Sequence, residues 1–417
     1  MATVSNGSDP EAKCFFGKGC EQVVSVRSQL LFPLLLGGVI AVSLSGCGDS
    51  SGARPNEERT LATDAERARF GPAIAAIGEQ AFVYGGFDGE MSSNPPFGDA
   101  YLLSPSDGTI DPVPTAPVEP LANPTAVAVE GSVMVLGVEC APDSPVSDDG
   151  PGPPSVDCGP GTMRGARFDP SSGSWDAVDV PDELARVTDL ELLGALGSDA
   201  IAGSESEGTL WTVDGNDLSW TRVDLPVALD DRSATVDSGN TRFSGCSAGP
   251  DQFVFVVWPG QGGSRTTAVP SVLREPGGAW HSGEPFETMP GVTELACSPD
   301  GALLYIGAPG MASWWFDTST AALTDTGKSP SQGRTAVGIG PMTWAGGRFS
   351  APVGNTTASV EFVPGEGWRT AGKWPAIIQR GTNVGVGDHV VFASSGPGDL
   401  DPAAEWADVG AVISHAP

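Results

Sequence analysis

The sequence predicts an all-β fold, and three observations support that class. The 417 residues include 57 Gly and 37 Pro, about twice the share found in average proteins, so turns must be frequent. The segments between these turns are short, rich in β-branched residues and without helical periodicity. The chain is nevertheless 40% hydrophobic and contains 11 Trp, which is enough apolar material for a large core.

A strand–turn–strand module recurs seven times from about residue 72 onward, at roughly 49 residues per copy. One four-stranded sheet cannot cover both of its own faces, whereas sheets arranged around an axis cover one another. The repeat therefore predicts a seven-bladed β-propeller of four-stranded blades over residues 61–417. The first turns are expected at 78–79, 130–131, 197–198, 250–251, 300–301, 346–347 and 387–388. The apolar second strands are expected at 81–86, 132–137, 199–204, 252–258, 302–308, 348–353 and 389–395.

Four tryptophans recur near the start of the last strand of their copies: Trp175, Trp220, Trp280 and Trp368. We expect them to fill the interfaces between neighbouring blades, and a ligand platform is the alternative. The last copy is too short for four strands. Because a propeller closes its ring by pairing the two ends of the chain, we expect the segment around 58–68 to supply the missing outer strand.

The first copy resembles a Kelch repeat. The shared features are Arg69 and Gly71 ahead of the first strand, the diglycine Gly85-Gly86 after the second strand, and the strand that contains Tyr101. The second copy supplies the matching second half, ARFDPSSGSWDAV. A diglycine at the end of the second strand occurs in the first copy alone, and later segments such as ELACSPDGALLYIG resemble other propeller families equally well. The resemblance implies a degenerate Kelch-type propeller similar to the central domain of galactose oxidase.

The N-terminal region has the order of parts of a lipoprotein leader. Residues 30–46 are uncharged and apolar, too short and too broken by Gly and Pro for a membrane span, but suited to a signal peptide. They end in Leu44-Ser45-Gly46-Cys47, which is similar to the bacterial lipobox. The resemblance implies a signal peptide over residues 1–46, with a later translation start as an alternative, a lipidated Cys47 and a flexible tether over 47–60. It further implies a bacterial protein that is anchored to the cell membrane and faces the extracytoplasmic side; a plain signal peptide or a membrane span with an incidental Cys is the alternative.

The charge balance excludes one class of partner. The formal net charge is -31, which repels phosphate backbones, so we expect no nucleic acid partner. A need for solubility, the attraction of cations or a saline habitat would each account for the same charge. We expect a monomer that binds the membrane through its lipid.

Four cysteines follow Cys47, and an even number outside the cytoplasm suggests disulfides. Cys140 and Cys158 flank a Pro- and Asp-rich insertion. Cys246 and Cys297 occupy equivalent positions, just before the first turn of consecutive copies. We expect the pairs 140–158 and 246–297 among the three pairings that are open, and a metal site is the alternative.

The connections between second and third strands vary most in length, and they all leave a propeller on the same face. We expect a protein, glycan or small ligand to bind on that face, around the axial pocket, through loops 86–99, 137–164 and 259–270. The polar candidates are Asp88, Asn94, Asp148, Asp149, Gln261 and Arg265, and the aromatic candidates are Trp258, Trp314 and Trp315.

Signals for catalysis are few. The three His residues lie in different copies, and Tyr84, Tyr101 and Tyr305 have no His neighbour in the sequence for a copper site of the galactose oxidase kind. We expect no cofactor and no catalysis, although paired acids such as Asp148-Asp149 leave Ca²⁺ open. The alternative is a propeller hydrolase or oxidoreductase with a site assembled from several blades. Convergent carboxylates with shifted pKa values would favour that alternative.

Overall fold

The structure is a computed structural model that contains the whole chain, and we describe the part of it that belongs to the unit Arg54–Pro417. The residues described are 59–60, 69, 71–87, 96–139, 146–147, 155–156, 161–226, 241–259, 266–288, 293–307, 310–330, 339–353, 358–373, 381–394 and 412–415.

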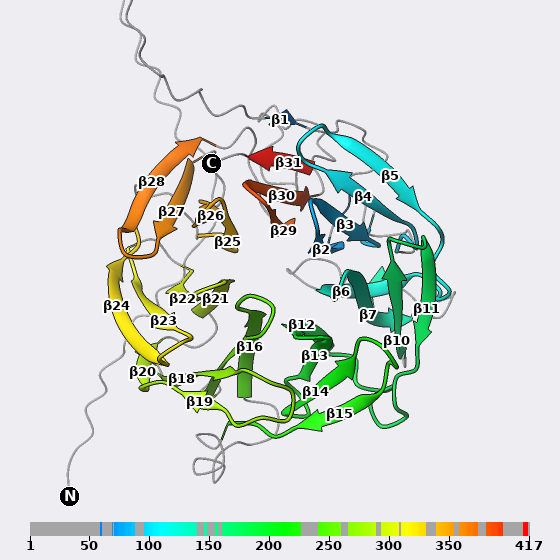
Figure 1. Cartoon of the computed structure of the whole chain (residues 1–417), viewed down its shortest axis with the longest axis horizontal. Helices are drawn as coiled ribbons and strands as arrows, with labels where there is room; N and C mark the ends of the chain where they lie inside the picture. The colour runs from blue at the N-terminus through cyan, green and yellow to red at the C-terminus, as the bar shows by residue number, and fades with distance from the viewer. Residues whose placement is uncertain are drawn as a thin grey trace, which may run out of the picture. The chain divides into compact units, whose positions relative to one another are not determined.

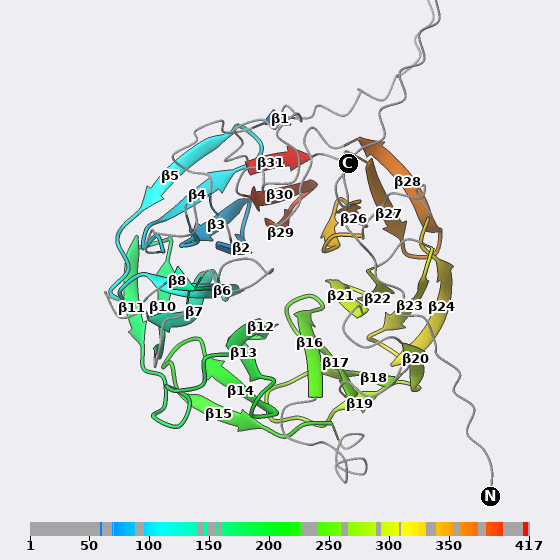
Figure 2. The ribbon, with the colours of Figure 1, turned by 180° about the vertical axis from the view of Figure 1, so that it is seen from behind.

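The described strands form seven sheets around a ring, which Figure 1 and Figure 2 show from its two ends. Sheet 1 contains β2 (Ala73–Ile77), β3 (Gln80–Tyr84), β4 (Ala100–Ser104) and β5 (Thr109–Val113). Sheet 2 contains β6 (Leu121–Val129), β7 (Ser132–Glu139), β10 (Thr162–Asp169) and β11 (Ser174–Val178). Sheet 3 contains β12 (Leu190–Leu196), β13 (Asp199–Ser204), β14 (Thr209–Asp214) and β15 (Trp220–Val223).

The remaining sheets follow in chain order. Sheet 4 contains β16 (Thr241–Ser247), β17 (Phe253–Pro259), β18 (Thr266–Leu273), β19 (His281–Ser282) and β20 (Phe286–Thr288). Sheet 5 contains β21 (Thr293–Ser298), β22 (Gly301–Ile306), β23 (Ala312–Asp317) and β24 (Ala322–Lys328). Sheet 6 contains β25 (Thr343–Ala345), β26 (Arg348–Pro352), β27 (Ala358–Val363) and β28 (Gly367–Lys373). Sheet 7 contains β29 (Gly381–Val386), β30 (His389–Ser394), β31 (Val412–His415) and β1 (Arg59–Thr60).

The all-β propeller of four-stranded blades is confirmed in six of these sheets, and sheet 4 departs from it with five strands. Both β19 and β20 pair with β18, so the outer strand of sheet 4 is broken in two. The break contains Gly283 and Pro285, and a Pro cannot donate to a strand ladder. The innermost strands of neighbouring sheets contact one another all the way around the ring.

The first turns lie where the sequence predicts them, with one exception. Glu130 and Gly131 form the tight turn between β6 and β7. Both have positive φ values, a conformation that favours Gly. The turn between β21 and β22 falls at residues 299–300, one position earlier than expected, because Gly301 is already paired with Ser298.

The recurring tryptophans pack between neighbouring sheets, as predicted. Trp175 of sheet 2 lies against Phe82 of sheet 1, with ring centroids 6.0 Å apart. Its Nε1 donates to the Pro114 carbonyl at 2.7 Å, so the contact combines apolar burial with a hydrogen bond. Trp368 makes the same two kinds of contact with sheet 5. Trp280 donates to the Asp224 carbonyl after sheet 3, while its ring lies against Phe255 of its own sheet in the core shared with sheet 3. Trp220 packs against the core between sheets 2 and 3.

The ring is closed by the pairing that the sequence predicts. Arg59 and Thr60 of β1 pair with Ser414 and Ile413 of β31, so a segment before the first sheet becomes the outer strand of the last one. Figure 1 shows the blue β1 beside the red β31. Among the described residues no helix is long and apolar enough to cross a membrane.

The disulfide between Cys246 and Cys297 is present, with Cα atoms 5.8 Å apart. It joins β16 to β21, the innermost strands of sheets 4 and 5. Cys140 and Cys158 lie outside the described residues, so their pairing stays a prediction.

Candidate functional site

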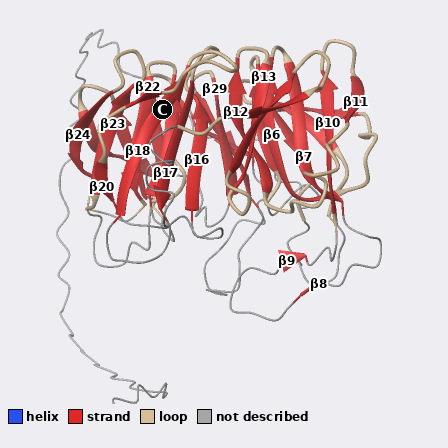
Figure 3. Cartoon of the chain, turned by 90° about the horizontal axis from the view of Figure 1, so that it is seen from below, coloured by secondary structure: helices blue, strands red, loops and turns tan. Residues whose placement is uncertain are grey.

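The two ends of the ring are built differently. At the turn end lie the short turns that join first to second strands and third to fourth strands. At the loop end lie the connections between second and third strands and those between sheets. Figure 3 shows the small hairpin of β8 (Val146–Ser147) and β9 (Ser155–Val156) standing off the loop end, beyond the ends of the sheets.

Most residues that the sequence singles out on these loops lie outside the described residues. They are Asp88, Asn94, Asp148, Asp149, Gln261 and Arg265. Trp258 belongs to β17 and pairs with Arg242 through the backbone, and its side chain is not described. Their role in binding stays a prediction.

Trp314 and Trp315 are consecutive residues of β23 and point to opposite faces of sheet 5. The Trp314 ring lies 4.6 Å from the Phe286 ring of sheet 4. The Trp315 ring lies 6.2 Å from the Phe349 ring of sheet 6. Both rings are half-buried, and these contacts are packing between sheets.

A groove opens at the loop end between sheets 1 and 2, with a volume of about 570 Å³. This size falls within the range of ligand pockets. The connection between the two sheets forms one wall, and the ends of β7, β10 and β11 form another. The lining residues are Gly98, Asp99, Thr115, Ala116, Pro117, Val118, Glu119, Pro120, Glu139, Arg164, Gly165, Ala177, Val178 and Asp179.

One edge of the groove is fixed by Arg69, whose side chain is 3% exposed. Its guanidinium donates to the carbonyls of Gly85 and Asp99, at 3.1 and 3.2 Å, and to the Asp99 carboxylate. It also lies over the Phe97 ring, 4.9 Å from the centroid. Since Gly85 and Asp99 flank the connection between β3 and β4, Arg69 holds the two ends of that loop together.

The opposite edge is fixed by an ion pair across the ends of the next long loop. Arg164 Nε lies 3.0 Å from Glu139 Oε2, and these residues flank the connection between β7 and β10. The groove therefore lies between the anchored ends of the loops that the sequence predicts over 86–99 and 137–164.

A second group of carboxylates gathers at the start of β12, also at the loop end. Asp189 accepts hydrogen bonds from the Ser206 backbone and from the hydroxyls of Ser204 and Ser206, at 2.7 to 2.9 Å. Glu205 accepts from the backbone of Phe243 in sheet 4, at 3.0 Å. Desolvation raises the pKa of Asp189, but these hydrogen bonds outweigh it and leave the pKa below its ordinary value.

The pKa of Glu191, in the same group, is shifted in the opposite direction. Loss of hydration among the surrounding strands, followed by repulsion from Glu205 and Asp189, raises the pKa of Glu191 to about 7. Glu294, on the innermost strand of sheet 5, has its pKa raised by desolvation as well. Both residues are nevertheless exposed at the surface. In the described part of the chain, no group of three or more His, Cys, Asp or Glu is arranged to hold a metal ion.

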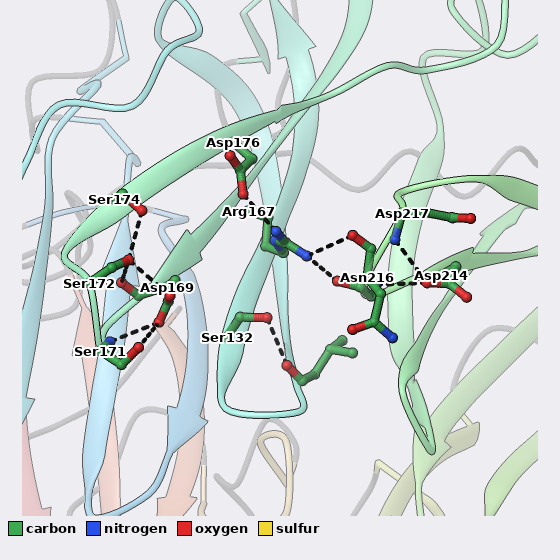
Figure 4. A network of polar contacts seen from close by, with 12 residues as sticks. Ser132, Arg167, Asp169, Ser171, Ser172, Ser174, Asp176, Asp214, Asn216 and Asp217 are labelled. Atoms are coloured by element: carbon green, nitrogen blue, oxygen red, sulfur yellow. Dashed lines mark hydrogen bonds and ion pairs between the residues drawn. The ribbon is translucent and has the colours of Figure 1, made fainter.

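At the turn end, in contrast, polar side chains form hydrogen bonds and ion pairs with the neighbouring turns. Figure 4 shows Arg167 of β10 reaching from sheet 2 to the turn of sheet 3, where it donates to the carbonyls of Gly215 and Asn216. The same guanidinium lies 2.6 Å from Asp176. Asp169 nearby accepts from the backbone and hydroxyl of Ser171 and from Ser172, which closes the third-to-fourth-strand turn.

Sequence reasoning missed the groove because its walls come from distant segments. The loops predicted over 86–99 and 137–164 include four of its lining residues, Gly98, Asp99, Glu139 and Arg164, but no predicted loop includes Thr115–Pro120 or Ala177–Asp179. The available signal was the pair of acids Glu119 and Asp179, each of which lies in a connection between consecutive sheets.

No family model matches the sequence, and no curated protein matches it. Among solved structures, a streptogramin B lyase is similar at 10% identity with a TM-score of 0.47, covering 82% of this chain and 94% of that one. YjhT is similar at 10% identity with a TM-score of 0.42, covering 84% and 93%. A putative 6-phosphogluconolactonase from Bacteroides uniformis ATCC 8492 is similar at 15% identity with a TM-score of 0.48, covering 76% and 89%. No function is inferred from these similarities.

Proposed function

We propose that this chain is an extracytoplasmic, lipid-anchored propeller of Kelch type that binds a ligand or partner at its loop end and performs no chemistry of its own. The observation that carries the proposal is the groove between sheets 1 and 2. It is of ligand size, and it lies between the anchored ends of the two loops expected to form the binding surface.

The proposed location rests on two features that are independent of each other. The sequence Leu44-Ser45-Gly46-Cys47 after an apolar run is similar to a lipobox. The disulfide between Cys246 and Cys297 favours an oxidising compartment, because disulfides are rare in the cytoplasm. Labelling of cells with a palmitate analogue tests the anchor: the label is expected on the native chain and lost in Cys47→Ser. Equal labelling of both would contradict it.

The binding role is tested by a thermal-shift screen of the full chain in detergent, after EDTA, against sugars, cell-wall fragments, short peptides and metal ions. A compound that binds only the folded state at one hundred times its Kd stabilises it by about 2.7 kcal/mol. We expect a compound to raise Tm in the native chain, and the rise to be lost when Ala177→Trp fills the groove. A rise that Ala177→Trp leaves unchanged would place the binding elsewhere.

One observation favours the second function, a propeller enzyme with a site assembled from several sheets. Glu191 has a pKa near 7 beside Asp189, whose pKa is lowered, and such a split is typical of an acid–base pair. Turnover of esters, lactones or glycosides by the native chain, abolished by Glu191→Gln and kept by the exposed neighbour variant Glu207→Gln, would establish it. Turnover unaffected by Glu191→Gln would exclude this residue as the catalytic group.

A further inference from the structure

The chemistry of the groove narrows the class of ligand. Its apolar surface comes from Ala116, Val118, Pro120, Ala177 and Val178, which are short side chains without hydrogen-bonding groups. Such a surface contacts alkyl groups and offers them no polar partner. No aromatic ring is among the groove's lining residues, so stacking on a flat ligand is not the basis of recognition.

Negative charges outnumber positive charges around this surface. Four carboxylates line the groove, against the single lining guanidinium of Arg164. Arg164 forms an ion pair with Glu139, and Asp99 forms one with the buried Arg69. Glu119 and Asp179 have no ion-pair partner among the described residues, and both are exposed. The groove therefore keeps a net negative charge after its internal pairs are counted.

The charge of the whole chain acts in the same direction. A net charge of -31 attracts cations toward the surface and repels anions. A concave surface with unpaired carboxylates concentrates that attraction where it opens to solvent. An anionic ligand in this groove would have to lose water while facing Glu119 and Asp179 without a free basic partner.

We propose that the groove binds an alkyl ammonium or alkyl guanidinium group, with Glu119 and Asp179 as the residues that recognise its charge. The inference rests on the proposed binding function and specifies its ligand. The cationic head is bound by the two carboxylates, and the alkyl stem lies on the surface formed by Ala116, Val118 and Pro120. A free amine and the Lys or Arg side chain of a partner protein present the same chemistry.

The test is calorimetric titration of the full chain in detergent with three probes: 1,5-diaminopentane, a short Lys-rich peptide, and the same peptide with every Lys acetylated. We expect the first two sources of ammonium to be distinguished by their affinities, and the acetylated peptide to bind at least about tenfold more weakly than its parent. The affinity should fall as salt is raised from about 0.05 to about 0.5 M NaCl, because exposed charges are screened.

Variants assign the effect to the groove. The double variant Glu119→Gln and Asp179→Asn should weaken binding about tenfold, and Glu119→Lys should weaken it further. The matched control, Glu79→Gln with Asp251→Asn, removes two exposed carboxylates at the turn end and should leave the affinity within about twofold. Circular dichroism melting confirms that each variant is folded.

Two results would overturn the inference. One is equal binding of the Lys-rich and acetylated peptides, and the other is unchanged affinity in the Glu119 and Asp179 variants. Neutral probes that bind and are blocked by Ala177→Trp would leave the proposed binding function standing while removing its cationic ligand. Absence of binding by both ammonium probes at millimolar concentration also contradicts the inference.

Discussion

The acidic residues in the third-to-fourth-strand turns and those that line the groove at the loop end differ in their partners. At the turn end, hydrogen bonds from Ser and Thr within the turns lower the pKa of Asp107, Asp169 and Asp317. At the loop end, Glu119 and Asp179 have no ion-pair partner in the described part of the chain, and the pKa of Glu191 is raised. The Asp residues of these turns satisfy the backbone, whereas Glu119 and Asp179 have no ion-pair partner among the described residues that line the groove.

This difference indicates which end of a repeated fold is free to form a binding site. Every sheet needs its turns, so Asp residues recur in them. Their carboxylates accept hydrogen bonds within the turns and therefore have a structural role. Connections at the other end are free to vary in length and charge without loss of the core. The following predictions would break or sharpen the comparison, from the largest expected effect to the smallest.

Removing the disulfide should cause the largest loss of stability. Cys246 and Cys297 lie near the turn end and are separated by 51 residues, which corresponds to about 4 kcal/mol in the chain-entropy account. We expect Cys246→Ala with Cys297→Ala to lower the midpoint of urea unfolding strongly. Glu119→Gln at the loop end is the control and should leave that midpoint unchanged; a similar loss in both would break the comparison.

Trp175→Phe should cost about 1–2 kcal/mol, because it reduces ring contact with Phe82 and removes the hydrogen bond to the Pro114 carbonyl. Trp220→Phe is a matched change, since Trp220 Nε1 has no hydrogen-bond partner among the described residues. Urea unfolding of both variants should show the smaller loss for Trp220→Phe. Equal losses would mean that the indole hydrogen bond contributes nothing.

Asp169→Ala should lower Tm modestly at neutral pH, because the turn loses its hydrogen bonds from Ser171 and Ser172. The pKa of Asp169 is below its ordinary 3.8, so the ionised form stabilises the fold above that pH. The stabilisation is lost as the pH falls through the folded-state pKa. Melting curves of the two proteins should therefore converge under strongly acidic conditions, and a constant difference would contradict this cause.

Glu191→Gln should have a small effect of the opposite sign. The folded-state pKa of about 7 lies above the ordinary 4.5, so ionised Glu191 destabilises the fold at alkaline pH. The native chain gains stability as the pH falls from about 7 to 4.5, whereas the variant has no such group. Melting temperatures should be higher in the variant above about pH 7 and equal below pH 4.5. A lower Tm in the variant at about pH 8 would contradict the raised pKa.

Much of the fold can be predicted from local sequence patterns that are present within each copy of the repeat. The turns at 78–79 and 387–388, the closing strand at Arg59 and the pairing of Cys246 with Cys297 depend on spacing within the repeat. The broken outer strand of sheet 4 was not predicted, although Gly283 and Pro285 mark it. A repeat pattern averages over such local interruptions.

The site is harder to predict because it is formed between copies. The sequence singles out Trp314 and Trp315 as aromatic binding candidates, yet alternation along β23 places them in two different interfaces. Glu119 and Asp179 look like ordinary acids in connecting segments. Only the packing of sheet 1 against sheet 2 brings them to one groove.

The most direct test of the central claim is hydrogen-exchange mass spectrometry of the full chain with and without the Lys-rich peptide. The account predicts slower exchange in residues 115–120 and 177–179, which line the groove at the loop end. It predicts no change in the turns at 169–173 and 317–321 at the other end. Protection confined to those turns, with unchanged exchange in the groove, would contradict the claim that the loop end is the binding end.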